Sequence, residues 1–408
     1  MEATIQMMIY ALLIIMFVFD LWLSILNYKN RNAEIPELVK DVYEDKAYEK
    51  YQEYAMTNYK FGLVIKTVNL LVIVVLLASG FFNWLNDFVV SIYQSYYIEI
   101  LMFLLFYYVI NFIVETVFAY IRAFKIEASF GFNKMTKKTF VNDKIKSFIL
   151  TLFLGGGLIY GLLALNKNTN WMFFIYAWLS LIVIIIVVNL IYTSVIVPLF
   201  NKLKPLKDGE LKKKIHVFAH SVGYQIDKIS VMDASKRSSK LNAYFSGFGK
   251  SKRIVLYDTL IEKMTDEEIV AVLAHEIGHS KYKHIIYNLF QTIVVLSIYI
   301  LFLTLFLEQS IFSEAFGFSE INIGFNLILY SIILSPVLTI VSMVSSFISR
   351  RFEYQADHFV KDNYNEEELI SALKKLSREN YANLTPHPLY VKLMYSHPPV
   401  SSRIKALK

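Results

Sequence analysis

The most specific chemical signal in the chain is a run of metal-binding residue types, His275-Glu276-Ile277-Gly278-His279. On a helix, side chains four residues apart project from one face, one turn from each other. Both imidazoles can therefore bind one tetrahedral ion, with the intervening Glu beside the water that attacks a substrate. Two surface histidines on an ordinary amphipathic helix are the alternative. A helix predicted over 265–284, which Thr265 and Glu268 can cap reciprocally, favours the metal site.

A catalytic zinc needs a third protein ligand and one open position. Because the chain has no cysteine, that ligand must be His, Asp or Glu. Glu353 is the best candidate, since Glu353 and Asp357 share a helical face just after the last apolar stretch. The two histidines lie just before the sixth stretch, at the same membrane depth. Asp357 then suits a supporting role, accepting a hydrogen bond from a ligand histidine and fixing its tautomer. The alternative is a solvated charged helix in which Glu353 pairs with a neighbouring arginine.

One further histidine has a suggestive setting. His397 precedes two prolines, a rigid segment that could hold its ring over a site as a hydrogen-bond donor, and Arg403 follows it. From spacing alone, a surface turn is the better interpretation of His397. The remaining histidines have no partner pattern and are interpreted as solvated or core residues: His216, His220, His284, His358 and His387.

The elements that must position these residues are largely membrane helices. Hydrophobic residues make up 56% and charged residues 18% of the 408 residues, against about 45–50% and about 25% in soluble domains. These values exclude an ordinary soluble enzyme and a disordered chain, and the lack of cysteine excludes disulfides, iron–sulfur clusters and cysteine nucleophiles. Seven apolar stretches reach the length of about 20 residues that a bilayer requires: 5–26, 63–82, 98–121, 148–165, 171–197, 285–307 and 323–348.

The distribution of positive charge predicts how these spans are oriented. The loops after the first and third spans are rich in Lys and Arg, whereas the N-terminal residues and the loop 83–97 have none. The positive-inside rule then places the N-terminus outside and the active site and C-terminus in the cytoplasm. The net charge of +7 is accordingly interpreted as a consequence of topology, and no nucleic-acid partner is expected.

This pattern predicts an all-α membrane protein with seven transmembrane helices and a cytoplasmic α+β metalloprotease domain. Within the polar insert we expect a helix over 207–223, strands over 228–233 and 253–258, and another edge strand between them. The tail is expected to hold a helix over 366–380. The predicted parts are 1–197 with five spans, the metalloprotease insert 198–284, spans six and seven in 285–348, and the cytoplasmic remainder of the catalytic domain in 349–408.

At these residues the chain resembles a known family, the integral-membrane zinc endopeptidases called type I CAAX prenyl proteases. The resemblance extends nearly from end to end. Beyond the two motifs described above, it rests on Lys236-Arg237-Ser238-Ser239, Asn242-Ala243-Tyr244, Gly247-Phe248, the stretch 252–260 and the juxtamembrane run Phe130-Gly131-Phe132-Asn133-Lys134.

The resemblance implies seven helices around a large chamber, with one zinc ion per chain at its cytoplasmic end. It implies that the ligands are His275, His279 and Glu353, and that Glu276 is the catalytic base. The implied substrate is a prenylated CAAX protein, cut so that its last three residues are released.

The resemblance also implies how a substrate is held. His397 would lie near the reacting carbonyl, and Asn242 and Ala243 would lie on a strand edge that binds the substrate backbone. Arg403 is assigned to substrate binding with them.

Some features differ from eukaryotic members of the family. The chain is somewhat shorter, the loop 308–320 is short, and Lys405-Ala406-Leu407-Lys408 lacks a paired-lysine retrieval signal. These features indicate a bacterial relative in the cell membrane. Its expected partners are membrane lipids and a peptide or protein substrate, with or without a prenyl group. The alternatives are a general quality-control metalloprotease without a prenyl requirement and a non-catalytic seven-span receptor or scaffold.

Overall fold

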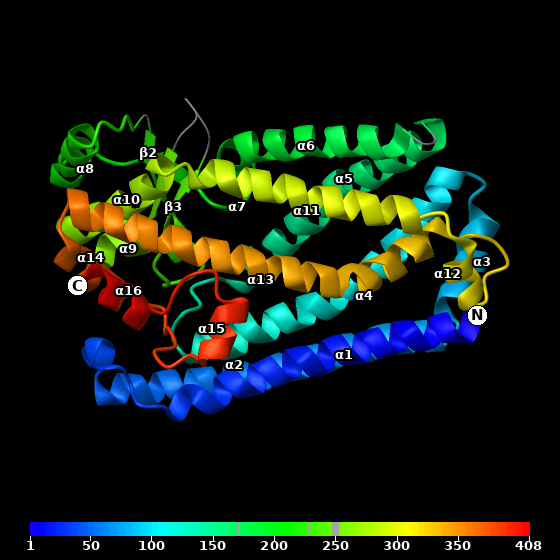
Figure 1. Ribbon diagram of the computed structural model, residues 1–408, viewed down its shortest axis with the longest axis horizontal. Helices are drawn as coiled ribbons and strands as arrows, with labels where there is room; N and C mark the ends of the chain where they lie inside the picture. The colour runs from blue at the N-terminus through cyan, green and yellow to red at the C-terminus, as the bar shows by residue number, and fades with distance from the viewer. Residues whose placement is uncertain (170–171, 227, 247–252) are drawn as a thin grey trace.

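The computed structural model describes residues 1–169, 172–226, 228–246 and 253–408. Trp171, Gly247, Phe248 and Lys252, which entered the predictions above, lie outside this part. Long helices run alongside one another, and a smaller domain with a β-sheet lies at one end of them (Figure 1). The N-terminus lies at the end of the molecule opposite this domain, whereas the C-terminus lies within the domain.

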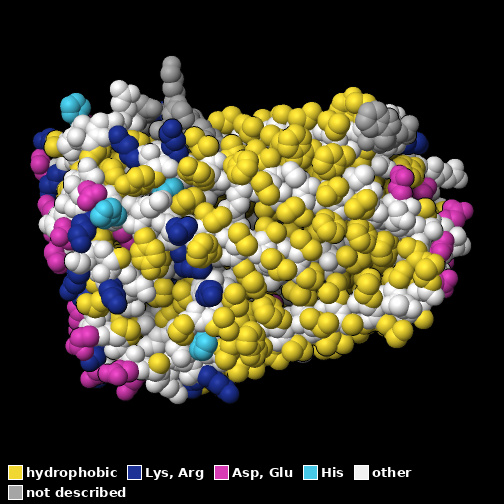
Figure 2. Space-filling model, viewed as in Figure 1, with side chains coloured by type: hydrophobic (Ala, Val, Ile, Leu, Met, Phe, Trp, Pro, Cys, Tyr) yellow, Lys and Arg dark blue, Asp and Glu magenta, His cyan; other side chains and the backbone are white. Residues whose placement is uncertain are grey.

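Seven helices in the described part are long and apolar enough to cross a membrane, as the sequence predicted. Their side chains form a broad apolar belt, while charged side chains gather mainly at the end with the sheet domain (Figure 2). The seven helices are α1 (Glu2–Lys29), α2 (Asp45–Ala78), α4 (Tyr96–Ile121), α5 (Lys137–Thr169), α6 (Phe173–Ile191), α11 (His284–Phe306) and α13 (Ile323–Asn363).

The spans are packed loosely against one another. Of the 18 most apolar consecutive residues in each span, only 6–11% are buried in six spans and 28% in α13. A helix on one side of a close-packed bundle would bury a stripe at least about 100° wide, more than a quarter of its surface. The spans other than α13 therefore leave most of their surface open to lipid or to the interior, and they are joined by two separate apolar clusters around Phe325 and Phe173.

Helix α13 connects the membrane part to the site. It is 41 residues long, which corresponds to about 60 Å at 1.5 Å per residue, twice the hydrocarbon thickness of about 30 Å. Its C-terminal half therefore leaves the membrane without a break and carries Glu353 and Asp357 into the sheet domain.

The domain contains a four-stranded sheet in the order β1-β2-β4-β3. Strands β2 and β4 are parallel, and the outer strands β1 and β3 are antiparallel to their neighbours. The two predicted strands and the further edge strand between them are thereby confirmed, and β1 is an addition. The strands are β1 (Leu203–Pro205), β2 (Lys228–Met232), β3 (Ala243–Ser246) and β4 (Arg253–Tyr257).

Helices pack on this sheet around a core that α10 dominates, with Ile269, Leu273 and Ile277 fully or almost fully buried. The three helices predicted here are confirmed as α8, α10 and α14, and the predicted fold class is confirmed with them. The domain helices are α7 (Val197–Phe200), α8 (Glu210–Ser221), α9 (Asp258–Lys263), α10 (Asp266–Lys281), α14 (Glu366–Glu379), α15 (Pro388–Met394) and α16 (Val400–Leu407). At the opposite end lie α3 (Phe81–Ile92) and α12 (Ser310–Ala315).

Candidate active site

Helix α10 is fixed at its N-terminus. The capping box forms as predicted: Thr265 Oγ1 accepts from the backbone N–H of Glu268, and Glu268 accepts from the backbone N–H of Thr265. The same buried carboxylate accepts hydrogen bonds from Ser371 Oγ at 2.6 Å and Lys375 Nζ at 2.7 Å, both on α14. These contacts tie the start of α10 to α14 and so fix which face of α10 points at α13.

Gly278 allows α10 to touch α13. A Cβ atom at this position would lie 3.1 Å from Phe359 Cβ and 3.2 Å from Ala356 Cα. Because the obstructing atoms belong to the backbone and the first side-chain carbon, they cannot move aside easily. The glycine between the two histidines therefore lets the helices that carry the two halves of the site approach closely.

His275, His279 and Glu353 meet at this contact. The two histidine Nε2 atoms lie 3.2 Å apart, and each lies 3.4 Å from one oxygen of Glu353. Four bonds of about 2.1 Å in tetrahedral directions place neighbouring ligand atoms about 3.4 Å apart. Glu353 Oε2 is buried and has no hydrogen-bond partner among the described residues. The spacing and the donor types therefore fit one zinc ion with an open fourth position.

Asp357 contacts the far side of the His275 ring. Its Oδ1 lies 2.9 Å from His275 Nδ1, so the Nδ1–H donates to the carboxylate and Nε2 faces the cluster. Arg403 pairs with both carboxylates. Its Nε donates a hydrogen bond to Asp357 Oδ2 at 2.8 Å, and its Nη1 lies 3.3 Å from Glu353 Oε2. Arg403 is only 9% exposed, so its guanidinium is enclosed by the groups it supports.

His397 lies on the open side of the cluster. Its Nε2 is 3.3 Å from Glu353 Oε1, and its side chain is 67% exposed. Arg350 on α13 donates to the carbonyl oxygens of Tyr395 and Lys392, which anchors the segment that leads into His397. The structure thus places His397 where a molecule in the site could reach it.

His284 is a site residue that the sequence pattern did not reveal. Its Nδ1 lies 2.8 Å from His279 Nδ1, and its Nε2 lies 2.8 Å from Gln355 Oε1. With the Gln355 oxygen accepting from Nε2–H, His284 Nδ1 becomes the acceptor for His279 Nδ1–H, which leaves the lone pair of His279 Nε2 facing Glu353. His284 is 2% exposed and stacks on Phe352 at 4.0 Å, so the ring is held rigidly.

Burial and neighbouring charges shift the pKa values of Glu276 and His275. Burial raises the pKa of the Glu276 carboxyl, and the nearby His275 and His279 oppose that shift. Burial and the charge of Arg403 lower the pKa of His275, but its hydrogen bonds to Asp357 and Glu353 outweigh them and raise it to about 9. A carboxylate with a raised pKa is the stronger proton acceptor, which suits Glu276 as a general base.

Asn242 and Ala243 lie at a free sheet edge. Ala243 begins β3, which pairs only with β4 among the described strands, and β3 packs against α10. The exposed Asn242 precedes it, and the neighbouring Leu241 is clamped by Asn380, whose side chain bonds both its N–H at 2.9 Å and its C=O at 3.0 Å. The segment that enters β3 is therefore held in an extended path.

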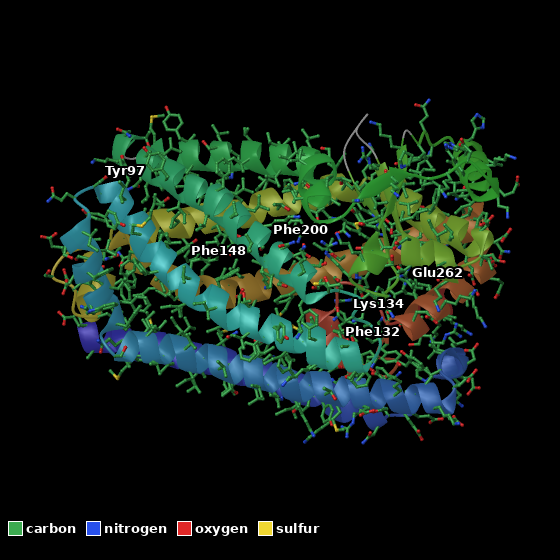
Figure 3. All side chains as sticks on the ribbon, turned by 180° about the vertical axis from the view of Figure 1, so that it is seen from behind. Tyr97, Phe132, Lys134, Phe148, Phe200 and Glu262 are labelled. Atoms are coloured by element: carbon green, nitrogen blue, oxygen red, sulfur yellow. The ribbon has the colours of Figure 1, made fainter. Side chains whose placement is uncertain are left out.

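The juxtamembrane run 130–134 braces the same segment. The carbonyl oxygen of Phe132 accepts a hydrogen bond from the backbone N–H of Ser239 at 3.0 Å. The backbone N–H of Lys134 donates to the carbonyl oxygen of Arg237 at 3.1 Å. Figure 3 shows Phe132 and Lys134 at the domain end of the spans, with Phe148 and Tyr97 progressively farther from it. The connection between α4 and α5 thus ties the membrane part to the strand beside the site.

Comparison with known proteins agrees with this architecture. Residues 24–202 match the family model "CAAX prenyl protease N-terminal, five membrane helices", and residues 205–408 match "Peptidase family M48". A "CAAX prenyl protease 1 homolog" of Oryza sativa subsp. japonica is 33% identical, with 97% of this chain and 95% of the relative covered. The "CAAX prenyl protease 1" of Saccharomyces cerevisiae is 34% identical, with 96% and 92% covered.

A solved structure extends the match to three dimensions. The crystal structure of S. mikatae Ste24p superposes with a TM-score of 0.92 at 34% sequence identity, and the match covers 98% of both chains. Sequence and fold thus agree over nearly the whole length. The chain therefore belongs to peptidase family M48, among the CAAX prenyl protease 1 homologues, and is an integral-membrane, multi-pass metalloendopeptidase.

Proposed function

We propose that this protein is a zinc-dependent endopeptidase that hydrolyses a peptide bond near the C-terminus of prenylated CAAX-type proteins. The observation that carries the proposal is the arrangement of His275, His279 and Glu353, whose ligand atoms are spaced for one tetrahedral ion beside Glu276. The names of the relatives, CAAX prenyl protease 1 and its homologues, support the substrate class.

The chain's own residues divide the chemistry among them. His275, His279 and Glu353 would hold the zinc ion, which when bound would supply a Lewis acid for the scissile carbonyl and would lower the pKa of water. Glu276 takes the proton from the attacking water and delivers it to the leaving amine. His397 donates a hydrogen bond to the oxygen on which negative charge develops.

Asp357 and Arg403 are proposed to keep the ligands in place. Asp357 holds the ring of His275 through Nδ1, and Arg403 balances the charge of Asp357 and Glu353. The assignment of Arg403 to substrate binding stays a prediction.

A substrate is proposed to bind as an added strand along β3. Among the described strands the outer edge of β3 has no partner strand, and the N–H of Ala243 at its start donates to the side chain of Asn242 at 2.9 Å. An extended peptide can pair along such an edge with little sequence requirement. Asn242, exposed at the start of this edge, can add side-chain bonds to the substrate backbone.

Asn242→Ala is expected to lower kcat/KM by a similar factor, about 5–10-fold, for several unrelated peptides, because one or two lost backbone bonds are shared by all substrates. Steady-state kinetics on a peptide panel measures this, with metal content as the check of the site. Lys204→Ala, exposed on the opposite edge strand β1, is the matched control. An effect that depends strongly on peptide sequence would show that Asn242 reads side chains.

The prenyl group is expected to change KM much more than kcat. A lipid can partition into the bilayer or an apolar wall at about 0.8 kcal/mol per buried CH₂, which concentrates the substrate without adding a contact at the reacting carbonyl. Such uniform binding lowers KM and leaves kcat nearly unchanged.

Kinetics on prenylated and unprenylated forms of one peptide, with and without chelator, tests this. A fully inert unprenylated peptide at saturation would mean that the lipid positions the scissile bond. Efficient cleavage of unprenylated, unrelated membrane peptides would instead favour the quality-control alternative. Membership of a metallopeptidase family argues against the non-catalytic receptor or scaffold.

We propose that the N-terminus is external and that the spans lie in 1–197 and 285–348. The catalytic unit, built from 198–284 and 349–408, is cytoplasmic. A cytoplasmic signal is expected from a reporter fused after Lys408, and an external one from a reporter inserted at Ser319, because the loops rich in Lys and Arg fall on one side. Reversed signals would overturn the orientation and the compartment of the chemistry. The bacterial cell membrane stays a prediction.

A further inference from the structure

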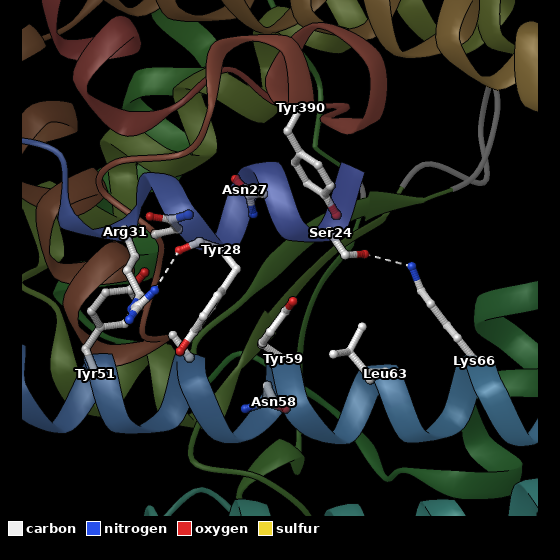
Figure 4. A pocket seen from close by; sticks show the side chains of 13 residues that line it. Ser24, Asn27, Tyr28, Arg31, Tyr51, Asn58, Tyr59, Leu63, Lys66 and Tyr390 are labelled. Carbon is white, nitrogen blue, oxygen red and sulfur yellow. Dashed lines mark hydrogen bonds between the residues drawn. The ribbon is translucent and has the colours of Figure 1, made fainter. Parts of the chain in front are cut away.

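A polar groove lies between α1 and α2, near the boundary between the apolar belt and the charged end. It encloses about 330 Å³, and its lining comes from α1 and the turn after it, from one face of α2, and from the C-terminal segment (Figure 4).

The groove is positively charged. Its lining includes Arg31 and Lys66 and no Asp or Glu. Arg31 donates one hydrogen bond, to the carbonyl of Tyr28 at 3.2 Å, and Lys66 donates to Ser24 Oγ at 2.8 Å and to the carbonyl of Asp20 at 3.1 Å. Within the described part of the chain neither cation forms an ion pair. The Asp20 carboxylate, one turn beyond Ser24, does not line the groove but lies beside it, since burial and then the charge of Asp20 raise the pKa of Tyr390 in the lining. Both cations therefore keep N–H groups available for an anionic or carbonyl ligand.

The shape of the groove suits an amphiphile. Its α2 lining runs from Tyr51 to Lys66, about 22 Å of helix at 1.5 Å per residue. Arg31 lies beyond the end of α1, whereas Lys66 lies within the apolar part of α2. A cation at membrane depth is costly and marks a binding site or a polar cavity. The groove thus leads from the aqueous interface into the hydrocarbon level.

Gly62 keeps the middle of the groove open. A Cβ atom placed there would meet nothing within 4 Å. A glycine inside a helix costs about 1 kcal/mol relative to alanine, and here no neighbouring side chain fills the space it leaves. The tyrosine hydroxyls and amides around this space, including Tyr59, Asn58 and Asn27, can bond ester oxygens.

We propose that the groove binds one anionic phospholipid, with the headgroup phosphate on Arg31 and the glycerol-ester region along Gly62 toward Lys66. Arg31 offers the planar donor pair that phosphate prefers, and Lys66 can donate to an ester carbonyl. Because Asn383 and Tyr390 also line the groove, the bound lipid would link α1 and α2 to the C-terminal segment that leads to His397.

Native mass spectrometry of the full-length protein, stripped of lipid in detergent and titrated with phosphatidylglycerol, phosphatidylcholine or inorganic phosphate, tests the proposal. We expect one phosphatidylglycerol per chain, bound at least about tenfold more tightly than phosphatidylcholine. Both lipids carry the phosphate, but the choline cation of phosphatidylcholine would lie close to Arg31 and be repelled by it. Arg31→Gln should remove this preference. Lys60→Gln, an exposed cation on the same stretch of α2 outside the groove, should keep it.

The variant Gly62→Leu distinguishes lipid bound in the groove from lipid bound elsewhere on the lipid-facing surface. It fills the open space without changing any charge and improves helix propensity, so it should abolish lipid retention in a folded protein. Equal binding of both lipids, or lipid retained by Gly62→Leu, would overturn the proposal. Displacement of phosphatidylglycerol by millimolar inorganic phosphate would overturn the lipid assignment and make the site one for free phosphate.

Discussion

Glu276→Gln is expected to keep one zinc ion per chain and to lose peptidase activity by about 10²–10⁴-fold, the contribution of a general base. The substitution removes the proton acceptor and leaves the three proposed ligands untouched. His279→Ala is expected to lose the metal as well as the activity, because two remaining ligands cannot form a tetrahedral protein site with one open position.

Metal analysis and peptide cleavage on the purified variants separate these two effects. His358→Ala is the matched control, because His358 lies on α13 near the site but is 65% exposed and, among the described residues, pairs only with Asp362. It should keep both zinc and activity. Full zinc occupancy in His279→Ala would contradict the ligand assignment, and full activity in Glu276→Gln would remove the base from the mechanism.

Arg403→Met is expected to destabilise the protein by about 3–5 kcal/mol, the cost of removing one partner from a buried ion pair. The buried carboxylates of Asp357 and Glu353 would then lose the guanidinium that pairs with both, and His275 would be left between two negative charges. A bound zinc ion supplies positive charge at the same place, so the loss should be larger in metal-free protein than in metal-loaded protein.

Thermal unfolding of the metal-free and metal-loaded protein measures this difference. Arg351→Met is the control, since Arg351 is exposed on the same helix. Adding Asp357→Asn to Arg403→Met should recover part of the lost stability, because it removes one of the unpaired charges. Equal Tm values for Arg403→Met and the wild type in both metal states would contradict the proposed support of the carboxylates.

Local patterns made the centre of the site predictable. The spacing of His275 and His279, and of Glu353 and Asp357, reflects the helical repeat, so each pair could be read without knowing the fold. Their meeting could be inferred because both pairs lie at the same membrane depth. The structure places the ligand atoms 3.2–3.4 Å apart, as a shared ion requires.

Contacts made through tertiary turns were not predictable in this way. His284 reaches His279 because Lys283 adopts a left-handed conformation, φ 59°, where α10 ends and α11 begins. No residue type in that turn signals such a conformation, since it occurs mostly in glycine and asparagine. The burial of Arg403 against Asp357 likewise depends on how α16 packs on α13, which the spacing of the residues does not reveal.

The fold shows the same division. The spans were predictable from apolar length, and the continuation of α13 to Asn363 has a signal as well, because 349–363 contains no glycine or proline. The short helices α3 and α12 were not predicted. They are too short to span a membrane, and their apolar residues were assigned to the loops between spans. The loose packing of the spans could not be inferred from composition, because lipid-facing and interior-facing positions both lack charge over most of each span.

Zinc-dependent cleavage of a CAAX substrate is tested most directly by mass spectrometry of the products that the purified wild-type protein forms from a prenylated CAAX peptide, before and after chelation and after zinc is restored. We expect that the intact C-terminal tripeptide is released, that chelation stops its release and that zinc restores it. Release of the tripeptide that is insensitive to chelation, or no cleavage by zinc-loaded protein, would rule out the proposed zinc-dependent mechanism.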